Sequence, residues 1–383
     1  MQRATMKRIL ILGAGFGGIA TALGLRDRID AHDEIVLVDR RATFAMGLRK
    51  NWGLAGIEPH AAGERPIDRL ADRGIDVRRA EITRIDPATR SAELDGEGLD
   101  ADVLVVALGA ERAPDAIPGL TEHGLDVYDR EANVANAAAI AAFAGGRVVV
   151  GVFGAPYPCP PAPYELALLL VDVFEARDLR VGTLVFTSLP RSLPILGEAG
   201  CGAFDGRLAL AGISLRTGAT ANEVRAGEVR LEVGTIPFDL LLAVPPHRAP
   251  AVVREAGLAA PSGWIAVDGR TLETRFPSVY AIGDVTAIPL TNGLALPKAG
   301  IFAQAEGEVV AARIVAALAG RTPEAEFSGE GMCFLETGRG RASAVQGSFL
   351  ADPPRVELTE PSEEGFRAKR AFETERLAAW FGD

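Results

Sequence analysis

The stretch Ile9-Leu10-Ile11-Leu12-Gly13-Ala14-Gly15-Phe16-Gly17-Gly18 decides the fold of this chain. Its four apolar residues predict a strand that is buried on both faces, and the glycines that follow match the pattern G-x-G-x-x-G. Helical periodicity follows over 19–25, and a second apolar run over 35–38 ends at Asp39, 21 positions after Gly18. A strand, a glycine-rich turn, a helix and a second strand in this order predict a unit that binds a dinucleotide.

Each part of the glycine turn has a predicted task. Gly13 permits the tight turn, Gly15 lets the backbone approach a pyrophosphate, and Gly18 lets the helix pack closely on the strand. Phe16 and Gly17 belong to the same turn, at a helix N-terminus whose free N–H groups and positive dipole end would face the phosphates. The alternative is a glycine-rich turn that binds no ligand.

The nucleotide site is expected to include residues beyond the turn. A carboxylate at Asp39 can accept hydrogen bonds from ribose hydroxyl groups. Arg40, the next residue, and Ile82 are assigned to the same cofactor site.

Composition limits the function classes. A chain of 383 residues holds two or three domains at about 150 residues each. Its formal net charge of −11 argues against a nucleic-acid-binding protein, which would carry a basic face. Three cysteines are too few for a disulfide scaffold, and neither they nor the four histidines have metal-ligand spacing. No metal site is expected.

No uninterrupted apolar stretch is long enough to cross a membrane. Basic residues precede the first apolar run, as in a signal peptide, but the glycines that interrupt it favour a buried strand. The expected location is the cytoplasm.

The expected fold class is α/β, with two Rossmann-like nucleotide-binding domains, as in glutathione reductase, and a small C-terminal α+β region. Residues 1–110 and 246–325 are assigned to the first domain. Residues 111–245 form the second, where apolar strands over 148–153 and 183–187 flank a helix. Residues 326–383 are expected to form a hairpin and a helix.

Two further segments indicate which dinucleotide is bound. Residues 274–284 resemble the second flavin motif of flavoproteins with two dinucleotide-binding domains. In that motif Gly283 would allow close backbone approach, and Asp284 would bind the ribityl chain of FAD. The strand over 102–110 resembles the strand of that fold that ends in Ala-Thr-Gly, and the matching residues are Ala107, Leu108 and Gly109. FAD is therefore the expected cofactor.

The second domain lacks a glycine string after its first strand. The segment 151–165 instead holds several prolines around Cys159, and proline has no N–H group to offer a phosphate. This argues against NAD(P)H as the electron donor.

The cysteines of the chain carry a family resemblance. Cys159, with Glu165 six residues later in a proline-rich turn before a helix, resembles the sulfide:quinone oxidoreductase and flavocytochrome c sulfide dehydrogenase family. Cys333, 174 residues after Cys159, matches the second redox cysteine of that family. Residues 283–303 and 372–382 are also similar, so that the resemblance covers essentially the whole chain.

The resemblance implies a function and roles for several residues. Cys159 and Cys333 would form a disulfide beside the flavin, hydrosulfide would attack one sulfur to form a persulfide, and the freed thiolate would pass two electrons to the flavin. Glu165 would manage the proton of the incoming hydrosulfide. A helix that opens at Pro297 and Lys298 would point its N-terminus at the flavin and favour the reduced anion.

Other interpretations of these residues stay open. A cysteine in an apolar strand can be a buried small hydrophobic residue, as composition alone suggests for Cys333, and Cys201 is expected to have a passive role. Glu165 can also be a carboxylate that favours a helix dipole.

The sequence departs from the family at two places. Quinone-reducing members commonly carry a third cysteine in the region that reads 123–131 here, and none is present. This resembles the flavocytochrome-type subunits, so the acceptor is either quinone or another group such as a cytochrome. Family members show small polar residues and proline where this chain has 49–52, so Lys50 lies either near the FAD phosphates or on a solvated turn. Basic and aromatic residues alternate over 366–381, a tail that could contact a membrane surface, its own domain or a partner subunit in a homo-oligomer.

The leading interpretation is an FAD enzyme that oxidises sulfide, or a related low-molecular-weight sulfur donor. An NADH:quinone oxidoreductase of the same fold is the first alternative. A flavin-binding redox sensor without turnover is the second.

Overall fold

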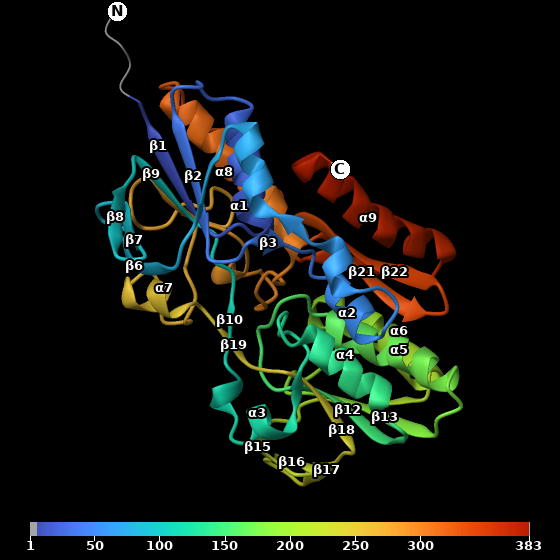
Figure 1. Cartoon of the computed structure of the whole chain (residues 1–383). Helices are drawn as coiled ribbons and strands as arrows, with labels where there is room; N and C mark the ends of the chain where they lie inside the picture. The colour runs from blue at the N-terminus through green and yellow to red at the C-terminus, as the bar shows by residue number, and fades with distance from the viewer. Residues whose placement is uncertain (1–5, 383) are drawn as a thin grey trace, which may run out of the picture.

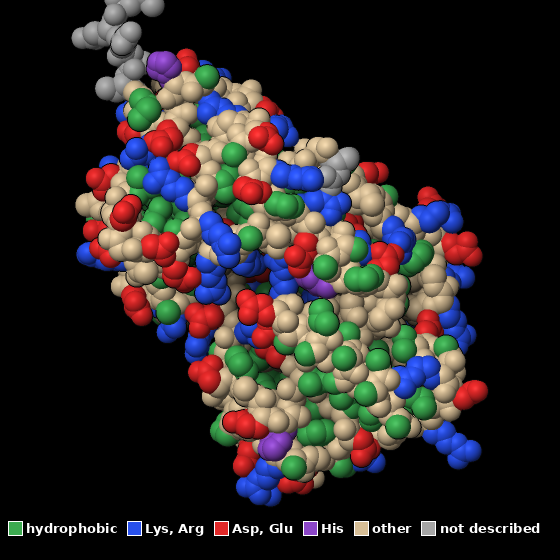
Figure 2. Space-filling model, viewed as in Figure 1, with side chains coloured by type: hydrophobic (Ala, Val, Ile, Leu, Met, Phe, Trp, Pro, Cys, Tyr) green, Lys and Arg blue, Asp and Glu red, His purple; other side chains and the backbone are tan. Residues whose placement is uncertain are grey.

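The computed structural model describes residues 6–382 and contains two parallel sheets of five strands each, with helices packed against them (Figure 1). An antiparallel sheet and a long helix form the C-terminal part. The predicted fold class, α/β with two Rossmann-like sheets and a small C-terminal α+β region, is confirmed. On the face shown in Figure 2, acidic and basic side chains are interspersed over most of the surface.

The first sheet is built from the strands that the opening sequence predicts. Its order is β20-β9-β1-β2-β5, with bounds Val279–Ala281, Val103–Val106, Arg8–Leu12, Glu34–Asp39 and Asp76–Arg79. Helices α1 (Phe16–Arg26) and α8 (Gly300–Leu318) pack against each other beside this sheet. Their close approach needs small residues, because a Cβ at Gly307 would lie 2.4 Å from the carbonyl oxygen of Gly17.

The second sheet has the order β11-β18-β12-β13-β14, with bounds Leu125–Asp126, Leu240–Val244, Gly146–Val152, Val181–Thr187 and Ile213–Arg216. Its central strands are continuous apolar runs, as expected of a parallel sheet covered on both faces. The associated helices are α4 (Asn133–Ala142), α5 (Ala162–Glu175) and α6 (Gly197–Leu210).

Short elements join the two sheets and extend them. The two chain segments that cross between the sheets form the antiparallel pair β10 (Glu111–Arg112) and β19 (His247–Arg248). Each domain also has an antiparallel sheet of three strands, β6-β7-β8 in the first and β15-β16-β17 in the second. Their bounds are Ile82–Asp86, Ser91–Leu94, Glu97–Asp100, Ala221–Arg225, Glu228–Leu231 and Thr235–Pro237. The remaining short elements are β3 (Thr43–Phe44), β4 (Arg65–Pro66), α2 (Arg49–Leu54), α3 (Leu120–His123) and α7 (Ala251–Glu255).

The predicted C-terminal hairpin is formed by β21 (Glu330–Gly338) and β22 (Arg341–Ser348), with β23 (Arg355–Leu358) as the third strand. Helix α9 (Glu363–Phe381) packs on this sheet (Figure 1). Leu377, Trp380 and Phe381 are buried against the rest of the chain. For these three side chains, the structure therefore favours packing on their own chain over contact with a membrane surface or a partner subunit.

Helix α8 differs from its predicted start. It begins at Gly300, because Lys298 and Ala299 belong to an extended segment, with Ala299 at φ −145° and ψ 141°. The carbonyl oxygen of Lys298 accepts a hydrogen bond from the backbone N–H of Cys159, at 2.6 Å, and therefore holds two segments together instead of joining the helix. Within residues 6–382 no helix is long and apolar enough to cross a membrane.

Candidate active site

The glycine turn has the geometry that its sequence predicts. Gly13 has φ +104°, and a Cβ there would lie 2.3 Å from the carbonyl oxygen of Ala107. A Cβ at Gly18 would lie 1.8 Å from the carbonyl oxygen of Gly13, so the helix can approach the turn only without a side chain. A Cβ at Gly15, by contrast, would meet no other part of the chain within 4 Å. The turn is thus closed by packing on one side and open at Gly15, which fits the backbone approach of a pyrophosphate.

Beside the turn lies a cavity of about 480 Å³. Five of the predicted cofactor residues line it: Gly13, Asp39, Arg40, Ile82 and Ala107. Gly109 follows strand β9 with φ +68°, a conformation that favours glycine.

The side chain of Asp39 is already held by the protein. Its carboxylate accepts hydrogen bonds from the N–H of Ala14, at 2.9 Å, and from the guanidinium of Arg41, at 3.0 Å. Burial alone would raise the pKa of Asp39, but Arg41 and the backbone N–H groups bring it below its ordinary value. Arg40, which was predicted to belong to this site, is exposed and lies 3.5 Å from Glu81. Arg41 is therefore the arginine that contacts Asp39, although the sequence did not point to it.

A second group of predicted residues lies where α8 begins. Gly283 has φ +72°, and its N–H donates a 2.6 Å hydrogen bond to the buried carboxyl of Glu306. Burial raises the pKa of Asp284 and that of Glu306, the latter to about 7. No residue within 6–382 donates a hydrogen bond to the Asp284 carboxylate, which faces a small cavity and is free to accept one from a ligand.

Lys298 borders the same cavity, but its ammonium is engaged. Its Nζ donates to the carbonyl oxygens of Asp284, at 2.6 Å, and Thr286, at 2.9 Å, and lies 3.5 Å from the centre of the Trp264 ring. Burial lowers the pKa of Lys298 to about 8. Lys298 thus fixes the loop that carries Asp284.

The two predicted redox cysteines meet in one cavity of about 110 Å³, although they lie 174 residues apart. Three other predicted site residues line the same cavity: Phe16, Lys50 and Glu165. Lys369 of α9 and the first residues of α8, Gly300 and Ile301, also border it. Both cysteines are free thiols in the structure, so the disulfide stays a prediction. Lys50 is partly buried in α2 and lines the cysteine cavity, so it lies neither on a solvated turn nor in the cavity beside Asp39.

The loop between β12 and α5 holds Cys159 in a constrained conformation. Cys159 has φ +53°, in the left-handed region that is uncommon for a residue with a side chain. The hydroxyl of Tyr128 donates to the carbonyl oxygen of Pro158, at 2.8 Å, and lies 3.3 Å from that of Cys159. Together with the hydrogen bond to Lys298, these contacts place the thiol at the boundary between the two parallel sheets.

The thiols differ in their surroundings. Burial raises the pKa of the Cys333 thiol. Burial also raises the pKa of Cys159, but the ammonium of Lys50 acts against this shift. Cys201 is buried in α6, where its Sγ donates to the carbonyl oxygen of Leu193 at 3.1 Å, in agreement with a passive role.

Glu165 is held by groups from three other segments. Its Oε1 accepts from the Asn51 side chain at 2.9 Å, and its Oε2 accepts from the backbone N–H of Glu336 at 2.8 Å. Lys369 of α9 lies 2.9 Å from Oε2 of Glu165 and 2.8 Å from Oε2 of Glu336. The indole N–H of Trp52 donates to Glu336 at 2.7 Å. Glu165 therefore joins the segment after Cys159 to the strand that carries Cys333.

Four residues around the cysteines were not predicted from the sequence: Asn51, Tyr128, Glu336 and Lys369. The signal for Lys369 was present in the composition, because the chain has only four lysines among its 40 basic residues. Because this chain uses arginine at most of its basic positions, the lysine in its last helix indicates a specific contact of that side chain.

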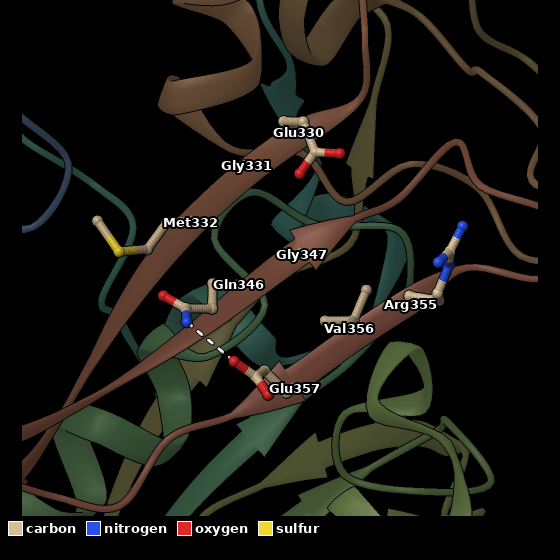
Figure 3. A pocket seen from close by; sticks show the side chains of 8 residues that line it. All are labelled: Glu330, Gly331, Met332, Gln346, Gly347, Arg355, Val356 and Glu357. Carbon is tan, nitrogen blue, oxygen red and sulfur yellow. Dashed lines mark hydrogen bonds between the residues drawn. The ribbon is translucent and has the colours of Figure 1, made fainter.

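An open groove of about 630 Å³ crosses β21, β22 and β23 (Figure 3). Met332 lies on one side, and Gln346 donates a 2.9 Å hydrogen bond to Glu357 across the strands. None of the predicted site residues lines this groove, so the cysteine cavity is the better candidate for the active site.

Residues 7–307 match the family described as pyridine nucleotide-disulphide oxidoreductase. The chain belongs to this family. Its members are flavoprotein oxidoreductases that typically bind FAD, and the open glycine turn and the free Asp284 carboxylate fit that cofactor.

Individual relatives match most of the chain at low identity. The mitochondrial sulfide:quinone oxidoreductase of Mus musculus is 22% identical over 365 residues, which cover 90% of this chain and 79% of that protein. The type II NADH:quinone oxidoreductase of Staphylococcus saprophyticus is 23% identical over a region that covers 86% of this chain and 87% of that protein. The solved structure of the sulfide:quinone oxidoreductase of Aquifex aeolicus matches with a TM-score of 0.89 at 23% identity, covering 98% of this chain and 92% of that one. This last likeness shows the fold.

Proposed function

We propose that this protein is an FAD-dependent oxidoreductase that oxidises sulfide, or a related low-molecular-weight sulfur donor, through Cys159 and Cys333. The two electrons would pass to a quinone or to another acceptor such as a cytochrome. The observation that carries the proposal is that both cysteines line one cavity at the start of α8. The mouse and Aquifex relatives, which are named as sulfide:quinone oxidoreductases, support the substrate class.

The residues that would hold FAD follow from the two cofactor regions. The glycine turn would hold the pyrophosphate, the cavity beside Asp39 would hold the adenosine, and Asp284 would accept from the ribityl hydroxyl groups. Bound there, FAD supplies a two-electron acceptor next to the cysteines. The N-terminus of α8 adds a positive dipole end at the same place.

The cysteine chemistry needs both sulfur atoms. Hydrosulfide attacks one sulfur of the disulfide, the S–S bond breaks, and the other sulfur leaves as a thiolate with the electron pair. The attacked cysteine then carries a persulfide. A second hydrosulfide takes the outer sulfur and leaves with it as hydrodisulfide, HSS⁻, which frees the attacked cysteine as a thiolate. Re-forming the S–S bond from the two thiolates releases two electrons, which bound FAD would accept. Glu165 and Glu336, both bonded to Lys369, would keep the two cysteine-bearing segments in place during this cycle.

Glu165 is also proposed as an acid or base for hydrosulfide. Its carboxylate lines the cavity, but both of its oxygens already accept hydrogen bonds. These contacts favour the positioning role over proton transfer.

The test is anaerobic mixing of the FAD-loaded protein with sulfide, followed by flavin absorbance. Sulfide should bleach the flavin, and Cys159→Ser should abolish the bleaching. Cys201→Ser is the matched control, because this cysteine lies buried in α6, and it should behave like the wild type. Full bleaching of Cys159→Ser would refute the proposal. Heat denaturation should release FAD in every variant.

A further inference from the structure

Lys50 is a basic side chain in the cysteine cavity that forms no ion pair with a carboxylate of residues 6–382. Burial lowers its pKa, whereas the nearby Cys159 thiolate and the Glu165 carboxylate act in the opposite direction. The other lysine of the cavity, Lys369, is paired with two carboxylates. Lys50 Nζ has only a long 3.4 Å contact with the carbonyl oxygen of Gly47, and it lies 4.3 Å from the centre of the Tyr128 ring. An ammonium has three donors, so this one can still bind an anion.

The use of lysine in this chain is selective. The sequence has 4 lysines and therefore 36 arginines among its 40 basic residues. Lys7 lies on the surface in a pair with Asp102, whereas the other three border the cysteine cavity or the cavity beside Asp284. A lysine ammonium is a compact point charge, which suits a small anion better than the planar fork of arginine.

Lys50 and the Cys159 loop share one support. The Tyr128 ring lies under the Lys50 ammonium, and its hydroxyl binds the backbone of the loop beside Cys159. The first residues of α8, Gly300 and Ile301, line the same cavity and add the positive end of a 19-residue helix. Two sources of positive potential therefore act on the space next to the Cys159 sulfur.

We propose that Lys50 makes the cavity beside Cys159 a subsite for a small anion, so that the sulfur donor enters as hydrosulfide or a similarly small anionic sulfur nucleophile. The inference deepens the proposed function and rests on it for the identity of the donor.

The experiment compares two alkylating agents on the reduced, FAD-loaded protein. Iodoacetate is an anion and iodoacetamide is neutral, and both react with a thiolate through the same displacement of iodide. The rate at Cys159 is followed by mass spectrometry of its peptide. The ratio of the two rates cancels any change in the thiolate fraction and so reports the local attraction for an anion.

We expect Lys50→Gln to lower the iodoacetate-to-iodoacetamide ratio about tenfold, whereas Lys50→Arg should keep most of it. Lys7→Gln should leave the ratio unchanged. In the wild type, thiocyanate should slow the iodoacetamide reaction in a saturable way, a measurement that needs no variant. An unchanged ratio in Lys50→Gln, or no saturable protection, would overturn the anion subsite. If Lys50→Gln lowers the ratio but sulfide does not reduce the flavin of the wild type, the anion subsite stands. Only the proposal of sulfide as the substrate is then refuted.

Discussion

Replacement of Lys369 by methionine should destabilise the fold around the cysteines. Lys369 is 1% exposed and lies between the carboxylates of Glu165 and Glu336. Burial alone would lower its pKa, but these two carboxylates raise it above the ordinary 10.5, so the ammonium stays charged at neutral pH. Methionine matches the stem of the side chain in length and leaves two buried carboxylates without their cation.

The cost of breaking a buried ion pair by removing one partner is about 3–5 kcal/mol. With a urea m-value of about 3 kcal/mol per M, this corresponds to a midpoint lowered by about 1–1.7 M. Tryptophan fluorescence should follow the transition, because Trp52 donates to Glu336.

Lys7→Met is the matched control. Lys7 forms a surface ion pair with Asp102, with 42% and 39% of the two side chains exposed, and such pairs contribute about 0–1 kcal/mol. If Lys369→Met unfolds at the same urea concentration as Lys7→Met, the buried network does not hold the two segments together, and the positioning role fails.

Three other changes have defined outcomes. Gly13→Ala should lose both FAD and stability, since its Cβ would meet the carbonyl oxygen of Ala107 at 2.3 Å and its φ is +104°. Gly15→Ala should keep the urea midpoint, because the space around this residue is open, and should lower the FAD affinity at least about tenfold, as measured by flavin fluorescence. Equal losses of stability and of FAD affinity in the two variants would contradict the assignment of Gly15 to the pyrophosphate. Burial raises the pKa of Glu306 from 4.5 to about 7, so this group stabilises the fold below pH 4.5, and about 3 kcal/mol is lost as the pH rises to 7. Glu306→Gln should flatten that profile in urea titrations at pH 5 and pH 8, and an unchanged slope would show that another group causes it.

The sequence predicted most of the fold because the parallel strands are continuous apolar runs with clear glycine turns. The helix after Asp284 is the exception. Pro297 and Lys298 look like a helix start, but the backbone of Lys298 binds Cys159 and its side chain binds the loop of Asp284. A tertiary contact of this kind has no local signature, so the helix begins at Gly300 instead.

The candidate site was predictable only in part, for a similar reason. Periodicity and spacing located the glycine turn, but nothing local joins Cys159 to Cys333, and only the family resemblance placed them together. Arg41 was missed, because nothing in the sequence shows that the chain after Asp39 turns the guanidinium back onto that carboxylate. Arg40, which was predicted, lines the same cavity. Lys369 was missed because the basic residues of α9 suggested a surface.

The loop after β12 links the substrate question to the cofactor question. In a dinucleotide site this loop would offer backbone N–H groups to a pyrophosphate, but here prolines surround Cys159, and the N–H of Cys159 itself donates to Lys298. The contact that brings the sulfur to the cavity thus also uses up a donor that a phosphate would need. The same loop cannot both present Cys159 in this way and cradle a second dinucleotide. Rapid bleaching of the flavin by NADH would therefore show that NADH binds despite this loop, and it would argue against the proposed sulfur chemistry. It would favour instead the activity named for the Staphylococcus relative.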